Sequence, residues 1–296
     1  MFKGSIVALV TPMLDDGSVD FASMGKLIEY HIENGTDGIV AVGTTGESAT
    51  LSFDEQQQVV QYVVEVVGGR VPVIAGNGTN NTAEAIVRTK TLEKLGVDGF
   101  LTVVPYYNKP SQKGLIAHFT AIAGSTCKPV LLYNVPGRTV TDLLPETVMA
   151  LAKIDNIVGI KEATGDLARL SQIKALCCQA PDEPFCLLSG DDPSALEFMR
   201  LGGDGVISVT ANVAAKEMAD LCDLALQGQF VAAQAVNEKL AVLHTTLFIA
   251  PNPTPAKWVL QQLGLITDDN VRLPLLTLEP IHHNDVKDAI KMAGLI

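Results

Sequence analysis

Short apolar runs rich in β-branched residues recur along the chain, and most are followed by a segment with helical periodicity. The runs begin about thirty residues apart, which is the length of one strand–helix unit. Continuous apolar strands that alternate with helices predict a parallel sheet covered by helices. We count eight runs, at residues 5–10, 38–42, 71–75, 99–104, 130–133, 157–160, 185–188 and 205–209.

Between these runs, apolar residues repeat at helical spacing and so mark one buried face of each helix. Eight strand–helix units permit closure of the sheet into an α/β fold of the (β/α)8 TIM barrel type. The alternative is an open doubly wound sheet, which usually carries a G-x-G-x-x-G turn after its first strand. The first run here ends in Val10-Thr11-Pro12, without that turn, and the barrel is preferred. The predicted helices are 21–33, 54–67, 82–95, 113–122, 145–152, 166–176 and 193–201.

After residue 209 the strand pattern stops and only helical patterns follow, at 214–226, 230–247, 255–263 and 285–293. The prolines at 251, 253 and 255 mark a loop within this stretch. We therefore predict a catalytic barrel over residues 1–226 and a C-terminal helical region over residues 227–296.

Composition narrows the class of protein. The net charge is −12 and no cluster of basic residues occurs, which argues against nucleic acid as a partner. The five cysteines form no C-x-x-C pair, which favours a reducing compartment over a disulfide framework or a zinc site. The chain shows neither a signal-peptide pattern nor an apolar run of membrane-spanning length, so we expect a cytoplasmic protein without a membrane partner. Asp182 and Glu183 suggest a surface insertion.

The sixth apolar run leads directly into Lys161. In TIM barrels the active site lies at the carboxyl ends of the strands, where this lysine is expected. Burial favours the neutral form of an amine, which can attack a carbonyl group and form a Schiff base. The simpler interpretation is that Lys161 is the first solvated residue after a strand. The residues at the other strand ends decide between the two.

The carboxyl ends of the predicted strands form one rim of the barrel. This rim carries hydroxyl and guanidinium side chains that suit carbonyl chemistry. Hydroxyl groups can move protons, a glycine-rich turn can hold a carboxylate through its N–H groups, and arginine can clamp a second carboxylate. Each residue alone has an ordinary structural explanation, such as a tight turn or a core aromatic. Their shared position favours a site around Lys161. The residues are Thr44, Thr45, Tyr106, Tyr107, Tyr133 and Arg138.

Other chemistries are disfavoured. A barrel often binds phosphate after strands seven and eight, but Asp191 and Asp192 follow the seventh run and would repel it. None of the five histidines falls at a predicted strand end, so the two aspartates lack the imidazole partners of a typical metal site. We expect neither a metal nor pyridoxal phosphate.

Together, these segments resemble the dihydrodipicolinate synthase family of the pyruvate-dependent class I aldolases, and the resemblance covers nearly the whole chain. Arg138-Thr139 after Pro136-Gly137 favours this family over the alternative, another pyruvate-dependent aldolase such as N-acetylneuraminate lyase. A non-catalytic barrel that binds a keto acid is disfavoured because binding needs no amine nucleophile. The matching segments are 43–50, 105–110, 132–139, 159–165 and 205–209.

The resemblance implies condensation of pyruvate with L-aspartate 4-semialdehyde to 4-hydroxy-tetrahydrodipicolinate, in the diaminopimelate and lysine pathway. It implies no cofactor beyond the covalent imine on Lys161, and a homotetramer built as a dimer of dimers. Lys161, Tyr133, Thr44 and Tyr107 would be catalytic, with Tyr107 reaching into the site of a neighbouring subunit. The implied substrate-binding residues are Thr45, Arg138, Gly190 and Ile207.

Many bacterial members of this family are inhibited by lysine, which binds in a pocket at a subunit interface. Phe53 and Gln56 stand where inhibited members often carry histidine. We therefore predict a weak or absent response to lysine. The residues that match the lysine pocket are Ser48, Ala49, Asn80, Glu84 and Tyr106.

Overall fold

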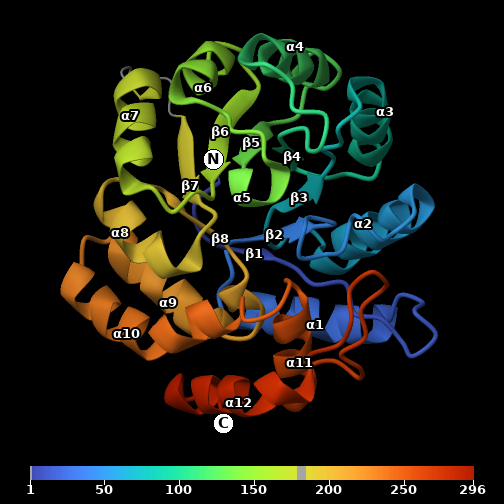
Figure 1. Cartoon of the computed structure of the whole chain (residues 1–296), viewed down its shortest axis with the longest axis vertical. Coiled ribbons are helices and arrows are strands. Elements are labelled where there is room, and N and C mark those ends of the chain that lie inside the picture. The colour runs from blue at the N-terminus through green and yellow to red at the C-terminus, as the bar shows by residue number, and fades with distance from the viewer. Residues whose placement is uncertain (1, 179–184) are drawn as a thin grey trace.

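The structure, a computed structural model, describes residues 2–178 and 185–296, so that Asp182 and Glu183 lie outside the described residues. Eight parallel strands form a closed barrel in sequence order, with helices around the outside (Figure 1). The predicted TIM barrel is confirmed. The strands are β1 (Gly4–Ala8), β2 (Gly38–Ala41), β3 (Val73–Gly76), β4 (Gly99–Val103), β5 (Val130–Asn134), β6 (Ile157–Glu162), β7 (Cys186–Ser189) and β8 (Gly205–Ser208).

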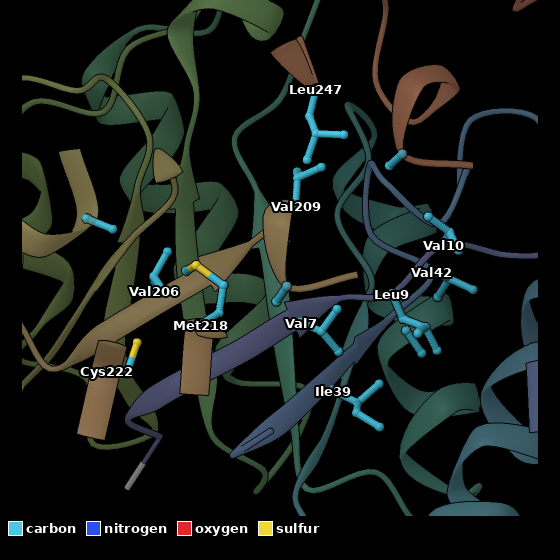
Figure 2. Close-up of a cluster of buried hydrophobic side chains, with 14 of the residues drawn as sticks. Val7, Leu9, Val10, Ile39, Val42, Val206, Val209, Met218, Cys222 and Leu247 are labelled. Atoms are coloured by element: carbon cyan, nitrogen blue, oxygen red, sulfur yellow. The ribbon is translucent and has the colours of Figure 1, made fainter. Parts of the chain in front are cut away.

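Successive side chains on each strand point alternately into the barrel and out toward the helices. On β1, Ile6 belongs to the cluster inside the barrel, and Val7 to the larger layer between strands and helices. Figure 2 shows part of that outer layer, where Val7 and Val206 face Met218 and Cys222 of α9 (Ala215–Leu226). The same alternation on β6 turns Ile160 outward, and this directs Lys161 into the barrel.

At the end of the barrel where the strands begin, one hydrogen-bonding arrangement is repeated. Asp37, Asp98 and Asp204 stand immediately before β2, β4 and β8, and each accepts a backbone N–H from the preceding odd-numbered strand at 2.8 Å. Asn156 stands before β6 and instead donates to three carbonyl oxygens. These bonds satisfy backbone groups that the strand ladder leaves open at this end.

The helices follow the predicted order, with capping residues at several starts. Ser52 and Glu55 form a reciprocal capping box at the start of α2. The predicted helix at 193–201 is divided into a 3-10 turn, Asp192–Ser194, and α8 (Ala195–Arg200). One short helix, α5 (Pro136–Thr139), was not predicted. The other helices around the barrel are α1 (Phe21–Glu33), α2 (Phe53–Val67), α3 (Thr82–Glu93), α4 (Gln112–Ala123), α6 (Pro145–Leu151) and α7 (Leu167–Cys177).

The C-terminal region comprises α10 (Phe230–Thr246), α11 (Thr254–Gln262) and α12 (His283–Met292), which lie beside α1 and α9 in Figure 1. Its buried side chains, including Leu240, Trp258 and Val286, belong to the same apolar layer that packs between the barrel strands and helices. The C-terminal region therefore shares the core of the barrel. Among the described residues, no helix has both the length and the apolar character needed to cross a membrane.

Candidate active site

A cavity of about 370 Å³ opens at the carboxyl ends of the strands. Its wall combines residues from the strand ends with residues of α10 and of the segment that joins α10 to α11. The lining includes Thr44, Thr45, Tyr133, Arg138, Lys161, Gly190, His244 and Asn252. Most of the residues predicted from the strand ends are thus brought together.

Lys161 and Tyr133 are direct register partners on β6 and β5. The lysine nitrogen lies 4.4 Å from the centre of the tyrosine ring, and the two residues expose only 5% and 7% of their surface. Within residues 2–178 and 185–296, the side-chain nitrogen of Lys161 forms neither an ion pair nor a hydrogen bond, and its contact is the one with the Tyr133 ring. The amine therefore has no carboxylate partner among these residues, and it faces a cavity that a small molecule can enter.

Gly190 packs directly against the stem of Lys161. Its N–H donates to the Glu162 carbonyl at 2.7 Å, which fixes it to the strand that carries the lysine. A Cβ atom at this position would lie 2.8 Å from Cε of Lys161 and 2.6 Å from Cβ of Ala163. Only glycine leaves room for the lysine side chain in this conformation.

The turn after β2 is anchored by the C-terminal region. Glu47, at a φ of 57°, forms a fully buried ion pair with Lys257 of α11 at 2.5 Å. Lys257 also donates to the Asn270 carbonyl at 2.6 Å. Burial lowers the pKa of Lys257, and the charge of Glu47 opposes that shift. Next to this pair, Asn252 donates a hydrogen bond from Nδ2 to Oγ1 of Thr45 at 3.0 Å.

A second anchored turn follows β5 and carries Arg138 on α5. Asn134, the last residue of β5, accepts the N–H of Leu143 at 2.9 Å and donates to Asp142 at 2.9 Å. Arg169 of α7 holds the same aspartate at 2.7 Å. The turn that presents Arg138 to the cavity is therefore fastened at its end.

Tyr107 and Ile207 do not line this cavity in the single chain. Tyr107 is 87% exposed and has a φ of 73° in the turn after β4. Ile207 lies within the apolar cluster inside the barrel, and Val209 lines the cavity instead of it.

The contribution of α10 and of the segment after it to the cavity was not predicted from the sequence. His244 lines the cavity, and its Nδ1 lies 2.9 Å from Oγ1 of Thr210. Burial lowers the pKa of His244, against the opposing charge of Asp192. Both carboxyl oxygens of Asp192 are buried, and Oδ2 accepts the N–H groups of Val209 and Thr210. The described residues contain no group of three or more histidine, cysteine or acidic side chains arranged to hold a metal.

A second cavity, of about 420 Å³, adjoins the first and shares Thr44, Tyr133 and Arg138 with it. Arg88 stands in its wall, donating to Glu84 at 2.9 Å and to Gln56 at 2.7 Å, with its guanidinium 4.9 Å from the Phe53 ring centre. The residues that match the lysine pocket all line this cavity, namely Ser48, Ala49, Asn80, Glu84 and Tyr106.

Comparison with curated proteins finds relatives that match over their full length. The 4-hydroxy-tetrahydrodipicolinate synthase of Escherichia coli O139:H28 is 56% identical over 296 residues, which is 100% of both chains. The protein of the same name from Shigella boydii serotype 18 has the same identity and coverage. Relatives from other Escherichia coli strains, at the same identity and coverage, carry the same name.

Comparison with solved structures gives the same result. The dihydrodipicolinate synthase of Acinetobacter baumannii, chloride-inhibited and complexed with pyruvate, is 50% identical with a TM-score of 0.96 and coverage of 100% of both chains. The enzyme of Cyanidioschyzon merolae with lysine bound is 41% identical with a TM-score of 0.95, covering 100% of this chain and 99% of the other. The sequence model of the dihydrodipicolinate synthetase family matches residues 1–293. Because the match spans almost the entire sequence and the relatives agree in fold and length, the chain belongs to the dihydrodipicolinate synthetase family.

Proposed function

We propose that this chain is the lyase that condenses pyruvate with L-aspartate 4-semialdehyde to 4-hydroxy-tetrahydrodipicolinate, in diaminopimelate and lysine biosynthesis. The observation that carries the proposal is the buried amine of Lys161, 4.4 Å from the Tyr133 ring centre and free of any carboxylate partner among the described residues. The names of the full-length relatives, and the pyruvate in the Acinetobacter baumannii structure, support these substrates.

In the proposed reaction, the neutral amine of Lys161 attacks the ketone carbon of pyruvate, and water leaves as the imine forms. The protonated imine nitrogen then takes up electrons when the pyruvate methyl group loses a proton, which gives an enamine. The enamine carbon attacks the aldehyde carbon of the second substrate. The amino group of that substrate then displaces Lys161 from the imine carbon, which closes the ring and releases the lysine amine. No cofactor or metal is required, because the imine nitrogen is itself the electron sink.

The hydroxyl groups have the proton-transfer role in this scheme. Tyr133 exchanges protons at the imine carbon, and Thr44 links it to Tyr107. Tyr107 is supplied by a neighbouring subunit, which agrees with its 87% exposure and with its absence from the cavity lining of its own chain.

The remaining residues bind the substrates. Thr44 and Thr45 hold the pyruvate carboxylate, and Arg138 binds the carboxylate of the semialdehyde. We also assign Gly190 and the backbone of Ile207 to the pocket. For Gly190 the support is its close approach to Lys161, and for Ile207 it is its position on β8, two residues before Val209 of the cavity wall.

We propose a cytoplasmic homotetramer, a dimer of dimers, in which residues 1–226 are the catalytic barrel and residues 227–296 the helical region that completes the site. Exposed aromatic side chains at Tyr106 (41%) and Tyr107 (87%) support a subunit interface at this edge. The ion pair between Glu47 and Lys257 supports the assignment of the C-terminal region to the site.

We propose further that Ser48, Ala49, Asn80, Glu84 and Tyr106 form the pocket that corresponds to the lysine-binding pocket of inhibited relatives, with a weak response in this chain.

The direct test is an activity assay of the purified chain. Pyruvate and aspartate semialdehyde should give product. N-acetylneuraminate, the substrate of the alternative lyase, should not be cleaved at a comparable rate. Cleavage of N-acetylneuraminate without condensation activity would refute the proposal.

A further inference from the structure

We propose that Asn252 is a positioning residue that directs the hydroxyl proton of Thr45 toward the carboxylate of pyruvate. This inference rests on the proposed function, because it requires that pyruvate binds against the turn after β2. Asn252 comes from the segment between α10 and α11, 207 residues away from Thr45 in the sequence.

The hydrogen bond between these residues has a defined direction. Nδ2 of Asn252 donates to Oγ1 of Thr45 at 3.0 Å. An amide nitrogen can only donate, whereas a hydroxyl has one proton and two lone pairs. Since the bond from Asn252 occupies a lone pair of Thr45, the hydroxyl proton remains available for another acceptor.

Both residues are buried and both line the cavity that holds Lys161. Thr45 exposes 3% of its surface and Asn252 exposes 6%. A buried hydroxyl proton without an acceptor is unfavourable, and a carboxylate is the strongest acceptor that can enter this cavity. The pair is thus prepared, before the substrate arrives, to donate to a carboxylate.

Asn252 uses only its donor group in this arrangement. Its Oδ1 is buried and forms no hydrogen bond within the described part of the chain. Within the described residues the amide group therefore interacts through its N–H group, which is the part that orients Thr45.

A purely structural role would be to fasten the C-terminal region to the turn. The neighbouring ion pair between Glu47 and Lys257, together with Arg272, already provides that attachment. Arg272 donates its backbone N–H to Glu47 at 3.1 Å and pairs with Glu55 at 2.5 Å. Removing the Asn252 amide should leave this attachment in place, so the two roles can be separated by experiment.

The experiment is a double-mutant cycle in the full-length protein. The variants are Asn252→Ala, Thr45→Val and the double variant, with Thr45→Ser as the conservative control that keeps the hydroxyl. KM for pyruvate, KM for aspartate semialdehyde, kcat and Tm are measured for each. In parallel, the pyruvate concentration that gives half-maximal borohydride trapping at Lys161 reports pyruvate engagement without the second substrate.

We expect Thr45→Val to raise KM for pyruvate about tenfold or more, as for loss of a hydrogen bond to a charged group. Asn252→Ala should raise KM for pyruvate about three- to tenfold in the parent protein and in the Thr45→Ser variant. In the Thr45→Val variant the same change should raise it by less than about twofold. KM for the semialdehyde should change little, and the trapping midpoint should follow KM for pyruvate.

If Asn252→Ala raises KM for pyruvate by the same factor with and without the Thr45 hydroxyl, the inference is overturned. An Asn252→Ala protein with an unchanged trapping midpoint, or one in which both KM values and Tm change together, would overturn it as well. If the parent protein is not trapped by pyruvate at all, the proposed function itself fails, and that result is distinct from the others.

Discussion

The side-chain nitrogen of Lys161 lies 4.4 Å from the centre of the Tyr133 ring, and the two residues are register partners on adjacent strands of the barrel. The backbone ladder between β5 and β6 thus fixes the separation of the amine and the phenol. A site built on paired strands is held more rigidly than one built on loops. The arrangement explains how the amine and the phenol can stay aligned, as the proton transfer proposed for Tyr133 requires.

Replacing Gly190 by alanine should impair catalysis through Lys161. The new Cβ atom would meet Cε of Lys161 at 2.8 Å, so the lysine side chain must move. A displacement of about 1 Å at a reacting group can cost about a hundredfold in rate. We expect kcat/KM to fall by about that factor, with a matching loss of borohydride trapping. Unchanged kinetics in a correctly folded Gly190→Ala protein would contradict the assigned packing.

Lys257→Met should destabilise the fold strongly. It leaves the buried carboxylate of Glu47 without its cation, which typically costs about 3–5 kcal/mol in the free energy of unfolding. Denaturant titration measures this loss, and Lys257→Met combined with Glu47→Gln should recover part of it. The matched control is Lys216→Met, which breaks the exposed pair with Asp220 and should change Tm little. An equal loss of stability in the two single variants would show that the buried ion pair stabilises the fold no more than the exposed one.

The stability of the fold should depend on His31 in mildly acidic solution. Burial lowers the pKa of this imidazole to about 3, while its Nδ1 lies 3.1 Å from Oγ1 of Thr36. The unfolded chain takes up a proton near pH 6.5 and the folded chain does not. Stability from this group is therefore complete above pH 6.5 and is lost as the pH falls from 6.5 toward 3.

Between pH 7 and pH 5 the loss attributable to His31 is about 2 kcal/mol. Denaturant titrations at several pH values measure the free energy of unfolding. It should fall less steeply with decreasing pH in His31→Phe than in the parent, whatever the difference in stability between the two proteins at pH 7. Parallel curves would mean that His31 is not a buried neutral group.

Lysine should inhibit this chain weakly or not at all. The carboxylate of Glu84, which would meet the ammonium group of lysine, is already paired with Arg88, and Gln56 and Phe53 hold that arginine in place. A lysine titration of the initial rate tests this, and strong inhibition at sub-millimolar lysine would refute it. Arg88→Met frees Glu84 and should increase the sensitivity to lysine.

Local pattern predicted the barrel, the order of its elements and the rim that carries Lys161, because each of these depends on periodicity within a few residues. Contacts across about 200 residues were not predictable in this way. The sequence around Lys257 does not indicate that this lysine is buried, although its side chain is fully buried beside Glu47. His244 and Asn252 were missed for the same reason, since they reach the cavity from α10 and the segment after it. Tyr107 was predicted from its place after the fourth strand, whereas its reach into a neighbouring subunit was predicted from the resemblance alone.

The most direct test of the central claim is borohydride reduction of the protein in the presence of pyruvate, followed by peptide mass spectrometry. The account predicts that the peptide containing Lys161 gains the mass of a reduced pyruvate adduct, and that Lys161→Ala abolishes both the adduct and the condensation activity. The absence of an adduct on that peptide in an active preparation, or an adduct on another lysine, would contradict the account.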